Sequence, residues 1–134
     1  MECYIGLDTA VRSTTNANVE LVSAATRNIF KRCIFPAFVD SADAIFVKVD
    51  GSGDIDRFVI FEDCIFSNAD NSSGTTMTAA MDVHASAGGH VIVNNCALIG
   101  ATDWEAADSG VIQLIGGTPS ATATGIAVDV DVTP

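Results

Sequence analysis

The sequence has few basic residues and no long apolar run, and both shortages exclude classes of function. Only 6 Lys and Arg residues stand against 17 Asp and Glu residues, which gives a net charge of −11. Binding to a nucleic-acid backbone or to an anionic membrane surface depends on clustered basic residues, so we expect neither partner. No apolar segment approaches the roughly 20 residues that a membrane-spanning helix needs. The acidic balance instead suits a basic partner or a cation.

Two further features are missing. The N-terminal residues contain Glu2, Asp8 and Arg12 and lack the apolar core of a secretory signal peptide. No segment combines helical periodicity with capping residues, and the nearest, 9–25, is too rich in Thr, Asn and Val. Hydrophobic residues nevertheless make up 49% of the 134 residues, which is enough for one domain with a core of its own.

A repeated pattern centred on cysteine is the strongest signal that is present. Cysteines stand at positions 3, 33, 64 and 96, with spacings of 30, 31 and 32 residues. Around the last three, the segments 27–36, 57–68 and 90–99 share the order apolar, apolar, polar, polar, Cys, apolar, large apolar. We expect a further copy near Val128, with valine in the place of cysteine. A fixed period of this length indicates repeats that stack to bury a common core.

Each repeat is predicted to contain short strands separated by Gly-, Asp- or Asn-rich turns. We therefore predict an all-β solenoid of about four coils of 30–32 residues, forming a single domain over 1–134. The expected coils are a partial one at 1–18 followed by 19–43, 44–76, 77–109 and 110–134. A β-sandwich or jelly roll also contains regularly spaced short strands, but it does not explain the cysteine period. Pro36 is expected to interrupt strand pairing, because proline lacks an N–H.

Stacked coils place equivalent residues above one another, with alternate residues inside and outside. Three inward ladders are predicted: Cys33, Cys64 and Cys96; Phe35, Phe66 and Leu98; Phe30, Phe61 and Val93. Two outward rows are predicted: Lys31, Glu62 and Asn94; Glu20, Lys48 and Asp82, with Gln113 as a further member. The cysteines are expected to be reduced core residues, with a disulfide or a zinc site as alternatives.

The segments 59–66 and 91–98 resemble coils of the right-handed parallel β-helix, the pectin-lyase-like superfamily. In that family an Asn or Asp often precedes a small inward residue at a corner. Asp63 and Asn95 match this pattern, whereas Arg32 departs from it, so we expect an altered corner in the first full coil. The resemblance implies a right-handed parallel β-helix. It also implies that members without catalytic clusters occur in phage virions as fibres, spikes and capsid decoration, often as trimers.

Candidate catalytic residues are lacking, because neither outward row places two carboxylates on neighbouring coils, as glycoside hydrolysis requires. A low-affinity binding site is conceivable around Trp104, with Asp103 and Glu105 beside it in a predicted loop at 100–109, and around His84. Trp104 would stack there on a sugar ring, with packing against the coil as the alternative.

A calcium site is the only cofactor hypothesis. Its ligands would be Asp50, Ser52, Asp54 and Asp56, which place oxygen atoms at alternating positions as calcium loops do. The segment lacks the later glutamate of such loops, and an acidic turn is the alternative.

Taken together, the sequence favours a non-enzymatic structural or interaction protein over an enzyme. We expect an assembly or virion component, such as a capsid decoration or a fibre-like element. It would form a homo-oligomer, a trimer or dimer, through the faces or ends of the β-helix, with a virion or cytoplasmic location. The alternative function is a carbohydrate-binding or polysaccharide-degrading module with a glycan partner. A third is a fragment whose active site lies on further coils.

Overall fold

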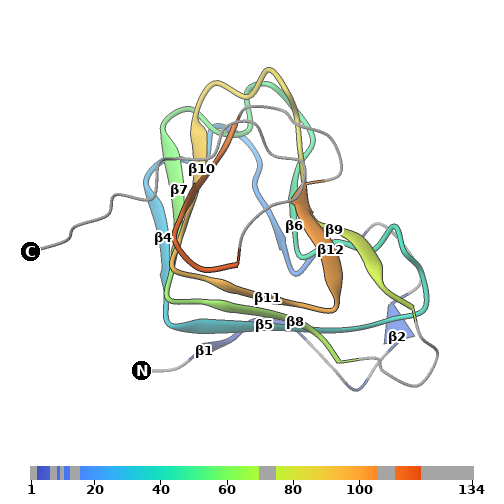
Figure 1. The fold of residues 1–134 in the computed structure, drawn as a ribbon. Coiled ribbons are helices and arrows are strands. Elements are labelled where there is room, and N and C mark those ends of the chain that lie inside the picture. The colour runs from blue at the N-terminus through green and yellow to red at the C-terminus, as the bar shows by residue number, and fades with distance from the viewer. Residues whose placement is uncertain are drawn as a thin grey trace, which may run out of the picture.

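The chain forms a stack of coils, and each strand pairs in parallel with the equivalent strand of the next coil (Figure 1). The computed structural model describes residues 3–6, 9, 11–12, 16–69, 75–105 and 111–118. Parallel strands need long connections, and here each coil supplies the connection. This arrangement confirms the predicted all-β parallel β-helix of about four coils. Within the described residues, no helix is long and apolar enough to cross a membrane.

Thirteen strands make up the coils. A partial first coil contains β1 (Cys3–Tyr4) and β2 (Val11–Arg12). The first full coil contains β3 (Val19–Glu20), β4 (Asn28–Lys31) and β5 (Cys33–Val39). The second contains β6 (Val47–Val49), β7 (Phe58–Glu62) and β8 (Ile65–Asn68). The third contains β9 (Met77–Val83), β10 (His90–Asn94) and β11 (Ala97–Ile99), and the fourth contains β12 (Ala101–Glu105) and β13 (Ile112–Ile115).

Three parallel sheets enclose the core. Their strand orders are β12-β9-β6-β3, β13-β10-β7-β4 and β1-β5-β8-β11, and β2 also pairs with β5. Figure 1 looks along the stack, so that the three sheets appear as the sides of a triangle with β4, β7 and β10 on the left and β5, β8 and β11 along the bottom. Inward side chains from all three sheets form one apolar cluster. A single coil cannot bury such a face alone, so the core depends on stacking.

The predicted aromatic ladders are confirmed. Phe30 pairs with Phe61, and Phe35 pairs with Phe66, in the β4–β7 and β5–β8 registers. Their rings stack almost parallel, with centroids 5.0 Å apart for Phe30–Phe61 and 4.5 Å apart for Phe35–Phe66. The ladders continue at Val93 and Leu98, the register partners of Phe61 and Phe66. Stacked aromatic pairs add attraction beyond the apolar area that they bury.

A left-handed corner precedes each buried cysteine. Arg32, Asp63 and Asn95 have φ values of 52°, 53° and 51°, so the expected altered corner at Arg32 is wrong. Each of the three residues donates its N–H to a carbonyl oxygen of the next coil, over 2.9, 3.0 and 2.7 Å. These stacked hydrogen bonds offset the steric cost of positive φ, which is lowest for Asn and Asp but is met by arginine here too.

Pro36 does not interrupt pairing, contrary to the expectation from sequence. It lies inside β5, is buried, and has Ser67 of β8 as its register partner. Alternate residues of a parallel strand direct their backbone groups to opposite neighbours. The carbonyl oxygen of Pro36 accepts a hydrogen bond from the Asn18 side chain on the side of the preceding coil, at 2.9 Å. The missing N–H therefore faces the gap between β1 and β2, where no ladder bond is required.

The fourth coil begins earlier than the sequence predicted. Val91 pairs with Ile112, an offset of 21 residues, whereas Val59 and Val91 are offset by 32. The opening strand of this coil is β12, which pairs with β9, rather than residues 110–115. Gln113 consequently pairs with Ile92 and does not extend the row of Glu20, Lys48 and Asp82. The predicted copy at Val128 lies outside the described residues.

Two glycines explain why the cysteine period ends. Gly116 has a φ of 60° and follows Ile115, the register partner of Asn94, so it occupies the corner position. Gly117 then lies where a cysteine stood in earlier coils, and Thr118 donates its N–H to the carbonyl oxygen of Cys96 at 3.0 Å. A Cβ on Gly117 would lie 2.3 Å from that same oxygen, so no side chain fits there.

Candidate functional site

The predicted sugar-binding residues around Trp104 are buried. Residues 101–105 form β12 rather than a loop, and Trp104 is fully buried. Its indole lies edge-on to Phe66 at a centroid distance of 5.4 Å, and its Nε1–H donates to the carbonyl oxygen of Thr118 at 2.7 Å. Asp103 and Glu105 are also buried. Trp104 is therefore a core residue with no ring face open to a sugar.

His84 is exposed and has a local role. It follows β9, and its Nδ1 accepts a hydrogen bond from the N–H of Ser86 at 3.1 Å. The N–H of Ala87 donates to the His84 carbonyl oxygen at 2.9 Å. These two bonds fix the turn that leads toward β10.

The four proposed calcium ligands are engaged in separate interactions. Asp54 accepts hydrogen bonds from the N–H of Gly51 at 2.7 Å and of Ser23 at 3.2 Å, which ties this turn to the preceding coil. Asp50 forms an ion pair with Lys48 at 2.6 Å, and this hydrogen bond raises the pKa of the Lys48 ammonium group. The described residues contain no group of three or more His, Cys, Asp or Glu side chains arranged to hold a metal ion.

The remaining two candidate ligands differ in kind. Asp56 lies 3.3 Å from the guanidinium of Arg57. The carbonyl oxygen of Ser52 accepts the N–H of Gly88 from the third coil at 3.0 Å. The calcium site stays a prediction, and the contacts seen here are those of an acidic turn.

The cysteine ladder is structural. Cys33, Cys64 and Cys96 are buried free thiols, whereas Cys3, the register partner of Cys33, is exposed. Each buried sulfur faces backbone carbonyl oxygens. The Sγ of Cys64 donates to Phe30 and Glu62 at 3.4 and 3.3 Å, and that of Cys96 donates to Phe61 and Asn94, both at 3.3 Å.

These surroundings keep the thiols protonated. Burial raises the pKa of the Cys33 thiol. The hydrogen bond with Cys64, followed by burial, raises the pKa of Cys96. Because the thiolate is the nucleophile and the metal ligand, protonated buried cysteines fit a packing role better than a reactive one.

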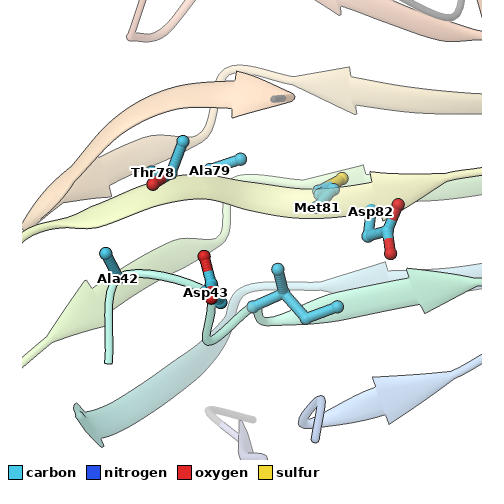
Figure 2. Close-up of a pocket in the computed structure, with 7 residues that line it drawn as sticks. Ala42, Asp43, Thr78, Ala79, Met81 and Asp82 are labelled. Carbon is cyan, nitrogen blue, oxygen red and sulfur yellow. The ribbon is translucent and has the colours of Figure 1, made fainter. Parts of the chain in front are cut away.

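A groove that sequence reasoning missed lies between the second and third coils (Figure 2). Thr78 donates its N–H to Ala42, and Phe46 donates its N–H to Ala80, at 2.8 and 2.7 Å. Three residues, 43–45, therefore stand opposite the single residue Ala79, and the chain bulges away from β9. The resulting hollow has a volume of about 260 Å³. Its lining consists of Ala42, Asp43, Ile45, Thr78, Ala79, Met81 and Asp82.

The chemistry of this groove is mixed. Its floor is apolar, with Ile45, Ala79 and Met81 all buried, and the exposed Asp43 and Asp82 bring two carboxylates to it. Such a lining suits an apolar group that carries a positive charge. The sequence signal for it was the run 40–43, which adds a turn before the apolar segment of the second coil.

The outer surfaces of two sheets differ sharply. On β3, β6 and β9 the predicted row Glu20–Lys48–Asp82 is confirmed, and we name this surface the charged face. On β4, β7 and β10 the outward register row is Ile29–Ile60–Ile92. We name the surface formed by these isoleucines, together with Phe58 and Ile115, the isoleucine face.

The isoleucine face is open to solvent. Ile29 is 59% exposed and Ile115 is 38% exposed, and the remaining three side chains are half-buried. Beside it runs the confirmed row Lys31–Glu62–Asn94, in which Lys31 and Glu62 form an ion pair at 2.8 Å. Scattered exposed apolar residues are normal on protein surfaces, but a contiguous row rimmed by polar residues is typical of an interaction site.

Comparison with other proteins adds no family. No protein family, curated protein or solved structure matches this chain significantly.

Proposed function

We propose that this chain is a non-enzymatic structural or interaction protein that assembles with copies of itself through the outer surface of its β-helix. The observation that supports this proposal best is the isoleucine face. Ile29, Ile60 and Ile92 follow one another on neighbouring strands of a parallel sheet, so their side chains form one continuous apolar strip. Removing such a strip from water is favourable by about 25 cal/mol for each Å² of apolar surface.

The acidic character of the molecule supports a specific rather than a general association. A net charge of −11 makes random contacts between copies repulsive. A partner of like charge must therefore meet the surface at a place where acidic residues are sparse or paired. The isoleucine face meets that requirement, because its charged neighbours Lys31 and Glu62 already neutralise each other.

The resemblance to β-helices of phage virions extends the proposal to a capsid decoration or a fibre-like component. That extension rests on fold-level analogy, because the same fold hosts many unrelated functions. It predicts an assembly of defined size, a dimer or a trimer, rather than an open-ended aggregate.

Molar mass in solution tests the proposal. Light scattering on a size-exclusion column should give a defined multiple of 13.9 kDa at micromolar concentrations. A single species of 13.9 kDa over the whole accessible concentration range would contradict self-assembly. Saturable binding to a glycan array by that monomer would support the carbohydrate-binding alternative instead.

A further inference from the structure

Charge changes sign along the edge of the isoleucine face, from one coil to the next. The first full coil carries Lys31 and Arg32 there, the second carries Glu62 and Asp63, and the third carries Asn94 and Asn95. The registers Lys31–Glu62 and Glu62–Asn94 align these pairs along the stack. The edge therefore reads basic, acidic and neutral in successive coils, on a chain that has only six basic residues in all.

This order is complementary to its own reverse. A two-fold axis parallel to the strands, midway between β4 and β7, would turn the partner's stack upside down. The first coil of one copy would then face the second coil of the other. Ile29 would meet the partner's Ile60, and Lys31 would meet the partner's Glu62. Two-fold interfaces require this reciprocal matching, in which residue i contacts j while j contacts i.

Other placements of the same faces match poorly. An axis centred on β7 would oppose Glu62 to its own copy, and one between β7 and β10 would oppose Glu62 to Asn94. An axis along the stack would turn Lys31 toward the end of β4 where Arg27 lies, and so bring like charges together. Juxtaposed like charges suppress wrong pairings, so the axis between β4 and β7 is favoured.

We propose that the isoleucine face binds a second copy of this chain about a two-fold axis between β4 and β7. This inference rests on the proposed self-assembly and specifies its surface and symmetry. The two Lys31–Glu62 ion pairs, one from each copy, would lie across the axis as a square of alternating charges. Arg32 and Asp63 would repeat the same exchange one residue further along the chain, at the corner.

Charge reversal tests this geometry. In Lys31→Glu the square holds four carboxylates, and in Glu62→Lys it holds four ammonium groups. Each single variant should weaken the dimer by about tenfold or more, as expected for close charge pairs at an interface. The double variant Lys31→Glu with Glu62→Lys restores the alternation within and between copies, and it should recover the dissociation constant. Ile60→Asp, at the centre of the strip, should abolish the dimer.

The charged face supplies the matched control. Lys48→Glu changes charge by the same amount as Lys31→Glu but lies on β6, away from the proposed interface. Its dissociation constant should equal that of the unmodified chain. Circular dichroism and thermal melting should accompany each measurement, so that a loss of dimer is separated from a loss of fold.

The outcomes distinguish this inference from the function on which it rests. A monomeric unmodified chain would overturn both. A stable oligomer that ignores Ile60→Asp and Lys31→Glu, or a trimer, would overturn the two-fold geometry and leave self-assembly standing. Weakening by the single charge reversals without recovery in the double variant would overturn the Lys31–Glu62 exchange. Weakening followed by recovery, with Lys48→Glu neutral, would support it.

Discussion

The sheet that contains β6 and the sheet that contains β7 belong to the same coils, yet their outer rows differ in chemistry. Inside, both contribute apolar side chains to one core, with Val47 and Met81 from the first and Phe61 and Val93 from the second. Outside, the first carries Glu20, Lys48 and Asp82, and the second carries Ile29, Ile60 and Ile92.

This contrast separates two kinds of constraint. The stack requires inward apolar residues in every sheet, because each coil buries its inner face against the next. It places no such requirement on the outer rows. An outer row that is nonetheless apolar in three successive coils therefore indicates a use beyond folding, whereas the charged face fits simple contact with water.

The largest effects should come from the inner residues that both sheets share. Phe61→Ala and Met81→Ala each leave a cavity in the core, where both side chains are fully buried. We expect losses of about 3–5 kcal/mol for Phe61 and about 2–5 kcal/mol for Met81 in the free energy of unfolding. Urea denaturation measures both. Ile60→Ala, on the outer side of β7, is the control and should cost clearly less than Phe61→Ala.

A smaller loss is expected at the cysteine ladder between the sheets. Cys64→Ser places a hydroxyl group in an apolar site, at a cost of roughly 1–3 kcal/mol. The carbonyl oxygens of Phe30 and Glu62 can accept its hydrogen bond, which favours the lower end of this range. The midpoint of urea unfolding should fall accordingly. An unchanged midpoint would be inconsistent with an inward Cys64.

Alkaline pH should weaken the ladder further. The thiols of Cys33 and Cys96 have pKa values raised above their ordinary 9.0, so the folded chain keeps protons that the unfolded chain loses. This contribution is complete below pH 9.0 and declines as pH rises through that value. Urea unfolding from about pH 8 to about pH 10 should show falling stability. In Cys96→Ala the decline should be shallower, and an identical slope would contradict this assignment.

The smallest effect should appear at the edge of the isoleucine face. Lys31→Ala removes the exposed ion pair with Glu62, and such pairs contribute about 0–1 kcal/mol to folding. Measured at concentrations below dimer formation, the loss should also shrink at high salt. A loss as large as that of Phe61→Ala would show that Lys31 has a packing role, and would blur the distinction between inner and outer rows.

Much of the architecture was predictable because equivalent residues recur at a nearly fixed spacing. The Phe30–Phe61 and Phe35–Phe66 ladders and both outward rows followed directly from aligning the cysteines. The isoleucine row was also visible in that alignment, since Ile29, Ile60 and Ile92 stand four residues before their cysteines. Its exposure could not be known, because the alternation that makes it outward has to be anchored by the core.

The failures occurred where the period changed. The fourth coil lacks the long connection of the third, so extrapolation from the earlier spacing assigned 100–109 to a loop. Asp103 and Glu105 strengthened that error, because two buried carboxylates on either side of Trp104 read as a polar loop. The groove beside β9 arises from a bulge of three residues opposite one, and a pattern of residue types does not encode such a mismatch.

One corner of the coil has a consequence for how this chain can change length. Between the third and first sheets, the second coil uses residues 69–76, whereas the third coil passes from β11 to β12 through Gly100 alone. A Cβ on Gly100 would lie 2.8 Å from that of Asn68, so the short form needs glycine at its φ of 75°. Strand register is the same on both sides of this difference. The corner is thus a natural insertion point, where a foreign peptide could be displayed without disturbing the layers above and below it.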